Sequence, residues 1–188
     1  MPQLPADILG EIFELLEDDR KTLYSCLLVN CLWCKIAVRI LWRNNSYYHS
    51  KTFVTLIACL PNESKEILNN NGIIIPTPTS KSPMFNYAAF CKSLSIDIIE
   101  SKAKIILIKN QQTISSDDDD FKNKVHILTH EILKLFMNQI SSLKYLSLKS
   151  VLYTNTLNIY PGAENCLRNL SELSCNSNSN SNLILPII

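Results

Sequence analysis

Near the start of the chain lies the stretch Leu4-Pro5-Ala6-Asp7-Ile8-Leu9-Gly10-Glu11-Ile12-Phe13-Glu14-Leu15-Leu16. It predicts a helix, because proline is tolerated in the first turn and Asp7 and Glu11 place negative charge near the positive end of the helix dipole. At about 100° per residue, its large apolar side chains cover an arc of roughly 160°, wider than the stripe of about 100° on an ordinary surface helix. This helix therefore needs two partners to cover its apolar surface.

Residues 18–41 predict two further short helices. Asp18 or Asp19 can cap the first of them, and Asn30 can end it and cap the next. The last helix carries apolar side chains at spacings of three and four, namely Leu32, Trp33, Ile36, Ala37, Ile40 and Leu41. Three helices in about 40 residues rarely fold on one small core without a disulfide, a metal or a partner. We therefore expect the second partner of the first helix to be another protein.

These residues resemble the F-box family in order and spacing. The matching positions are Leu4, Pro5, Asp7, Ile8, Leu9, Ile12, Phe13 and Leu16, then Leu27, Leu28, Val29 and Trp33, and finally Leu41, Trp42 and Arg43. The resemblance implies a non-catalytic substrate receptor of an SCF-type cullin-RING ubiquitin ligase, which docks a Skp-type adaptor. Asn30 and Cys31 depart from the family, where many members have cysteine and then a basic residue, and this departure predicts a weaker polar contact at the rim.

The resemblance also implies which residues contact the adaptor, because family members use their apolar positions for that contact. Carried over to matching positions, the predicted contact residues are Leu4, Pro5, Ile8, Leu9, Ile12, Phe13, Leu16, Val29 and Trp33. The alternative for each of them, above all for Leu16 and Val29, is a place in the core of the three-helix module itself.

Beyond the module, apolar residues at helical spacing predict helices at residues 52–60, before Pro61, and at residues 64–68. Pro76, Pro78 and Pro83 oppose regular structure and indicate a linker. Residues 90–96 predict a helix end that leads into a short strand. Residues 125–140 predict an amphipathic helix before a strand at 143–148.

A third strand-like segment at residues 170–175 suggests a repeat. Leu94 lies 52 residues before Leu146, which lies 27 residues before Leu173. Both offsets suit a period of about 26 residues, within the range of leucine-rich repeats, although no clear middle copy follows Ile96. Residues 176–182 alternate asparagine and serine and supply no capping unit. We therefore expect a short, truncated array.

Three other features contain residue types that occur in metal, redox, catalytic or phosphorylation sites. Cys31 and Cys34 have the spacing of a zinc or redox pair, but the other ligands of a zinc site are missing from the sequence around them. His126 and His130 lie four apart without the glutamate position of a metalloprotease. The acidic run 117–120, with Ser115 and Ser116 before it, predicts a solvated loop or an acid-directed phosphorylation site. The three glycines are isolated, so no phosphate-binding loop is predicted.

The composition is that of an ordinary globular protein, with 46% apolar residues and a formal net charge of +1. So small a charge gives no general attraction to nucleic acid or an anionic membrane. No signal segment opens the sequence, and its isoleucine-rich runs are too short to span a bilayer. Seven cysteines without such a signal indicate a reducing compartment, so we expect a cytoplasmic or nuclear protein.

The sequence thus predicts a mainly α-helical protein: a three-helix F-box at residues 1–44, a helical connector and proline-rich linker at residues 45–89, and a short α/β leucine-rich-repeat-like solenoid at residues 90–188. We expect it to bind a Skp-type adaptor, through it a cullin-RING ligase, and an unknown protein target, without a cofactor or metal. The alternatives are a ligase-independent interaction protein, a truncated F-box protein that docks but recognises no target, and a thiol or metal enzyme built on the cysteine or histidine pair.

Overall fold

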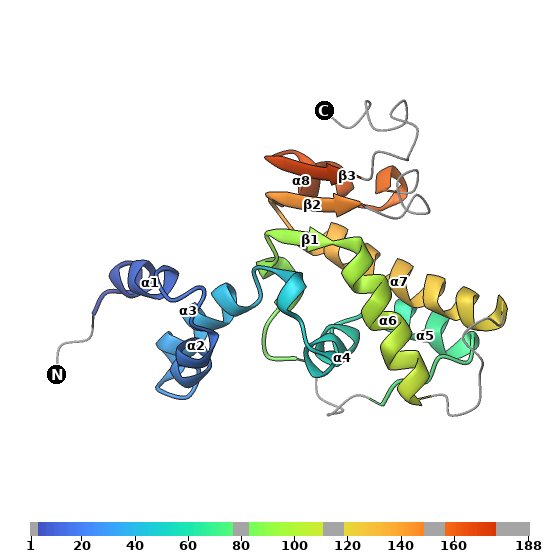
Figure 1. Cartoon of the computed structure of the whole chain (residues 1–188), viewed down its shortest axis with the longest axis horizontal. Coiled ribbons are helices and arrows are strands. Elements are labelled where there is room, and N and C mark those ends of the chain that lie inside the picture. Colours follow the sequence, from blue (N-terminus) through green and yellow to red (C-terminus); the bar gives the residue numbers. More distant parts are fainter. Residues whose placement is uncertain (1–3, 77–82, 111–118, 149–156, 176–188) are drawn as a thin grey trace.

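The computed structural model describes residues 4–76, 83–110, 119–148 and 157–175. This part of the chain is mainly helical and contains one small three-stranded sheet (Figure 1). Ser115, Ser116 and the polar tract 176–182, all of which carried predictions, lie outside the described residues. Within the described ranges, no helix combines the length and the apolarity needed to cross a bilayer.

The first three helices are α1 (Ala6–Glu14), α2 (Arg20–Cys26) and α3 (Cys31–Leu41), called the N-terminal module below. Both predicted caps are confirmed: the Asp19 side chain accepts a hydrogen bond from the Thr22 amide (3.1 Å), and that of Asn30 accepts one from the Trp33 amide (2.9 Å). Pro5 occupies the N-cap position of α1, where its missing N–H removes no helical hydrogen bond. The three predicted helices of the module are therefore present.

The connector contains the short 3-10 helix η1 (Asn45–Tyr47), then α4 (Ser50–Ala58) and α5 (Asn62–Asn70). The helices predicted at residues 52–60 and 64–68 are both present, and each of their four ends lies two residues from its predicted position. Pro61 separates them and is the N-cap residue of α5. The 3-10 helix η2 (Tyr87–Phe90) then leads into the sheet.

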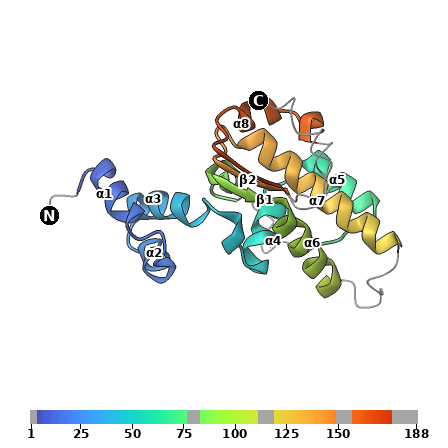
Figure 2. The ribbon, with the colours of Figure 1, turned by 45° about the horizontal axis from the view of Figure 1, so that its top comes forward.

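The sheet consists of β1 (Ser93–Ser95), β2 (Tyr145–Leu148) and β3 (Glu172–Cys175), all parallel and in that spatial order. Leu94 pairs with Leu146, and Leu146 pairs with Leu173, which is the alignment that the sequence offsets predicted. Parallel neighbours need long crossover connections, and these are supplied here by helices (Figure 2). The strand register is thus confirmed.

The regular repeat of about 26 residues is not found. β1 and β2 are hydrogen-bonded neighbours, so no middle strand lies between them, and the chain between them forms α6 (Ile96–Asn110) and α7 (Asp119–Gln139). The connection from β2 to β3 contains only the 3-10 helix η4 (Leu157–Ile159) and α8 (Ala163–Leu167) among its described residues. The two units differ too much to form a uniform array, and a leucine-rich repeat is not shown.

Two smaller predictions are also corrected. Ile96 was expected in the first strand but is the first residue of α6, where its side chain is buried. Asp119 and Asp120 were expected in a solvated loop but form the first turn of α7, where the helix dipole favours negative charge. Asp117 and Asp118 lie outside the described residues.

The edge of the sheet at β1 is closed by the chain that follows α3. The carbonyl oxygen of Arg43 accepts hydrogen bonds from the amides of Lys92 (2.7 Å) and Ser93 (3.0 Å). The buried side chain of Asn45 accepts a bond from the Ser95 amide (2.8 Å) and donates one to the Ser95 carbonyl (2.9 Å). Because an amide side chain carries both a donor group and an acceptor oxygen, Asn45 takes the place of the backbone of a neighbouring strand. The N-terminal module is therefore joined directly to the sheet.

Candidate docking surface

The outward face of α1 exposes large apolar side chains. Ile8, Ile12 and Leu15 have exposed fractions of 45%, 42% and 87%, and Leu4 just before the helix has 52%. These positions recur at spacings of three and four residues, so they lie on one side of the helix. Singly exposed apolar residues are common on proteins, whereas a contiguous exposed apolar row is typical of surfaces that bind a partner.

A second exposed apolar group lies at the turn between α2 and α3. Leu28 and Val29 have exposed fractions of 88% and 55%, and Tyr24 on α2 has 46%. We call the two groups together the docking surface; its residues are Leu4, Ile8, Ile12, Leu15, Tyr24, Leu28 and Val29. The short turn that carries Leu28 and Val29 is set by the Asn30 cap, which begins α3 directly after it.

The nine predicted contact residues divide into three groups. Leu4, Pro5, Ile8, Ile12 and Val29 are exposed, whereas Leu16 and Trp33 are half-buried. Leu9 and Phe13 are only 2% and 1% exposed, so their prediction as surface contacts is corrected: they form the core of the module. The reason is geometric, because both lie on the side of α1 that packs against α3.

Trp33 connects the surface to that core. Its ring meets the ring of Phe13 edge to face, with 5.1 Å between the centroids. Phe13 therefore supports a residue that can reach a partner, although Phe13 itself is covered.

Sequence reasoning omitted three residues of the docking surface: Leu15, Tyr24 and Leu28. Leu15 could have been found, since it follows Ile8 by seven residues and so lies on the same face. Leu28 and Tyr24 could not have been predicted, because the periodicity of a short helix does not show which of its apolar residues the neighbouring helices cover.

An ion-pair group fixes α1 to the end of α3. The Arg43 guanidinium lies 2.5 Å from a carboxylate oxygen of Glu14 and 3.3 Å from one of Glu17. The hydrogen bond from Arg43 lowers the pKa of Glu14, and the bond to Glu14 raises the pKa of Arg43. Arg43 thus helps to hold α1, which carries part of the docking surface, in its place beside α3.

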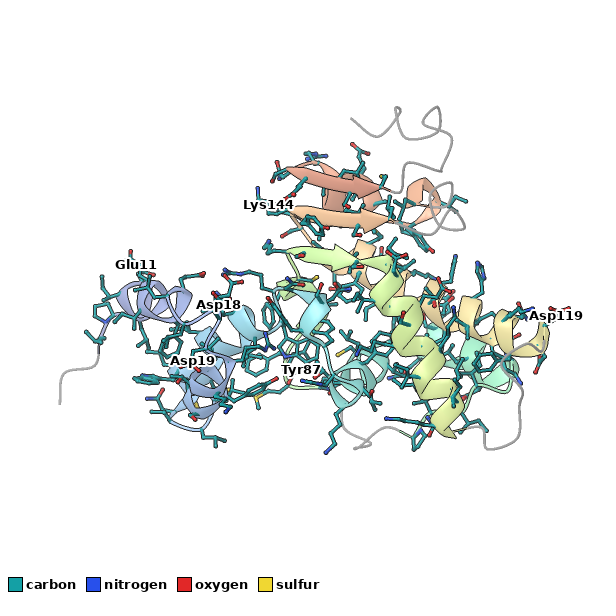
Figure 3. The ribbon with its side chains drawn as sticks, in the orientation of Figure 1. Glu11, Asp18, Asp19, Tyr87, Asp119 and Lys144 are labelled. Atoms are coloured by element: carbon teal, nitrogen blue, oxygen red, sulfur yellow. The ribbon has the colours of Figure 1, made fainter. Side chains whose placement is uncertain are left out.

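An aromatic group joins the module to the rest of the protein. Trp42 packs against Tyr48 and Tyr87, with centroid distances of 5.0 Å and 4.3 Å, and the Tyr48 hydroxyl donates a hydrogen bond to the Trp42 carbonyl (2.7 Å). Tyr87 belongs to η2, and Figure 3 shows it at the junction between the module and the remaining helices. The module that carries the docking surface is therefore packed against the rest of the protein through these aromatic rings.

The remaining candidate sites are not assembled in the part of the chain that the structure describes. Cys31 is exposed and Cys34 half-buried, and both are free thiols. The rings of His126 and His130 are 6.4 Å apart, and His130 packs against Tyr160 at 4.9 Å. Among the described residues, no three His, Cys, Asp or Glu side chains are grouped so that they could hold a metal ion.

The comparison with family models agrees with this picture of the N-terminal helices. An F-box-like family model matches residues 1–47. The match ends at the last residue of η1, and the docking surface lies inside the matched segment. No curated protein and no solved structure matches the chain. The match covers 47 of the 188 residues, so it supports an F-box-like N-terminal segment, a type of domain whose typical role is to dock a Skp-type adaptor.

Proposed function

We propose that this protein is the target-recognition subunit of an SCF-type cullin-RING ubiquitin ligase. It would dock a Skp-type adaptor through the docking surface, and through that adaptor the cullin, while its C-terminal α/β half presents a protein target. Ubiquitin transfer is then carried out by the partners, and this chain supplies binding only. A cytoplasmic or nuclear location is part of the proposal, supported by seven free cysteines.

One observation carries the proposal: the exposed apolar row on α1 lies inside the F-box-like segment. Covering Ile8, Ile12 and Leu15 with a partner removes apolar area from water, at roughly 25 cal/mol per Å² before the costs of association. Leu9 and Phe13, buried behind this row, keep the helix rigid, so little order is lost on binding.

The test is capture of the purified chain by a Skp-type adaptor from the same organism. We expect the wild type to form a stoichiometric complex, and the double variant Ile8→Asp, Ile12→Asp to lose at least about a hundredfold in affinity, because it places two charges in an apolar contact. Isothermal titration calorimetry measures both.

The matched control is the double variant Ile105→Asp, Ile108→Asp on α6, whose isoleucines have similar exposed fractions of 38% and 54%. It should bind the adaptor like the wild type. Circular dichroism must show equal helicity for all three proteins. A folded wild type that does not bind the adaptor would contradict the proposal and favour a ligase-independent interaction protein that uses the same apolar row for another helix.

A further inference from the structure

The three strands begin in a repeated backbone pattern. The carbonyl of Arg43 accepts from the amides of Lys92 and Ser93, the carbonyl of Lys92 from those of Lys144 and Tyr145, and the carbonyl of Lys144 from those of Ser171 and Glu172. Arg43, Lys92 and Lys144 therefore occupy the same position on three successive rows. Neighbouring rows of a sheet are about 4.8 Å apart, so the three basic residues form a ladder along the N-terminal edge of the sheet.

This ladder lines a groove of about 1130 Å³ between the sheet and the N-terminal module. α1 forms the opposite wall with residues that include Asp7, Gly10 and Glu14, and α3 contributes Ile36 and Arg39. Figure 1 shows that all three strands start on the side where the module lies, and Figure 3 shows Lys144 at that edge.

The charges in the groove are divided between its walls. Arg43 is engaged by Glu14 and Glu17, as described above. Lys92 donates a hydrogen bond from Nζ to the Ser142 carbonyl (3.0 Å), and neither Lys92 nor Lys144 has a carboxylate partner among the described residues. The sheet wall is therefore basic, whereas the wall formed by α1 and the turn after it, with Asp7 and the two glutamates, is acidic.

Apolar surface lies beside the basic wall. Phe90 and Tyr145 are half-buried and line the groove, and the Arg39 guanidinium lies 5.9 Å from the centroid of the Phe90 ring. A ligand that carries a carboxylate next to an apolar side chain would satisfy both features. The acidic α1 wall would repel the same carboxylate and so orient the ligand toward the sheet.

The groove and the docking surface lie on different sides of α1. At about 100° per residue, Gly10 and Glu14 are rotated roughly 160° and 120° from Ile8. An adaptor seated on Ile8, Ile12 and Leu15 would therefore leave the groove open for a second protein.

We propose that this groove binds an acidic segment of the protein target, with a carboxylate paired to Lys92 and Lys144 and a neighbouring apolar side chain against Phe90 and Tyr145. The proposal rests on the proposed function only in calling that protein a target. It places target recognition at the junction between module and sheet.

The test is fluorescence anisotropy with the full chain and a labelled peptide in which glutamates flank a phenylalanine. We expect the wild type to bind this peptide, with affinity that falls as salt is added, and not to bind the same peptide with glutamines in place of glutamates. Lys144→Glu should weaken binding about tenfold, because it replaces an attraction by a repulsion. Lys92→Gln serves as a second variant, with a smaller loss in the same direction.

The matched control is Lys51→Glu, an equal charge change at an exposed position on α4 outside the groove, which should alter affinity less than twofold. Absence of binding by the wild type, equal binding of the glutamine peptide, or an equal loss in Lys51→Glu would overturn the proposal. Adaptor capture is measured on the same samples. If the adaptor captures the chain but the peptide does not bind, the proposal for the groove is rejected and the proposed function stands. If the peptide binds but the adaptor does not capture the chain, the ligase role is rejected and the proposal for the groove stands.

Discussion

Arg43 shows how much of this structure depends on single residues at one junction. Its guanidinium pairs with Glu14 and Glu17, and its carbonyl oxygen accepts hydrogen bonds from the backbone amides at the start of β1. Two residues later, Asn45 completes the edge of that strand with its buried amide. The orientation of α1, and with it that of the docking surface, therefore depends on contacts made outside α1.

The Arg43–Glu14 pair predicts a specific pH dependence. The pKa of Glu14 in the folded protein lies below its ordinary value of 4.5, mainly through the hydrogen bond from Arg43. The stabilisation is therefore fully present above about pH 4.5 and is lost as the pH falls through the lower, folded-state pKa. Because the Glu14 side chain is 49% exposed, solvent screening limits the effect to about 0.5–1 kcal/mol.

A double-mutant cycle of Arg43→Gln and Glu14→Gln, followed by urea unfolding, measures this coupling. We expect the coupling at neutral pH and expect a much smaller one at an acidic pH below the lowered, folded-state pKa of Glu14, where the carboxylate is protonated. A coupling of the same size at both pH values would show that the contact is not an ion pair.

At the scale of elements, α1 combines two functions in nine residues: one side builds the core of the module and another is left exposed.

The start of α8 depends on close packing against α7. α8 begins after Gly162, which has φ of 80°, a backbone conformation that side chains other than glycine rarely adopt. A Cβ atom there would lie 2.7 Å from the Met137 carbonyl oxygen of α7.

Two glycine substitutions should therefore have opposite effects. Gly162→Ala is expected to lower the free energy of unfolding by about 1–3 kcal/mol, because it combines an unfavourable φ with a backbone clash. Gly10→Ala lies within α1, where a Cβ atom meets nothing within 4 Å, and should raise the helix stability by about 0.5–1 kcal/mol. Urea denaturation of both variants decides this. Equal effects of the two changes would mean that the contact with α7 does not constrain α8.

At the scale of the whole molecule, the F-box-like match and the packing of the chain do not share a boundary. The match ends at residue 47, but Trp42 packs against Tyr48 and Tyr87, and Asn44 pairs with Ser93. Deletion after residue 47 would expose Trp42, which is 9% exposed in the full chain, and would remove the partners of Arg43 and Asn45 in β1. The module is physically part of a larger core.

We therefore expect the fragment 1–47 to unfold without the cooperative transition of the full chain, because so short a segment buries too little apolar surface alone. Thermal unfolding followed by circular dichroism compares the two. Addition of a Skp-type adaptor should restore helicity in the fragment by coupled folding and binding. A sharp transition in the isolated fragment, at the temperature of the full chain, would contradict this expectation.

The amino-acid sequence by itself determined the local features of this protein. Proline, aspartate and asparagine placed the starts of α1, α2 and α3, because caps act on backbone groups only a few residues away. The leucine offsets gave the register of β1, β2 and β3, because strand faces alternate with a period of two. α6 was missed, since its many isoleucines show no clear helical stripe, and it is stabilised instead by packing against α4 and α7.

Only the tertiary structure decided which apolar residues of the module are covered and which elements connect the strands. Leu9 and Ile12 look alike in the sequence, yet one is 2% exposed and the other 42%, because α3 covers a single side of α1. The uneven connections, with α6 and α7 in one and α8 in the other, replaced the expected repeat. The groove and its basic ladder depend on Arg43, Lys92 and Lys144, which strand pairing alone brings onto neighbouring rows. Burial and long-range pairing depend on the whole folded chain, which is why local patterns could not supply them.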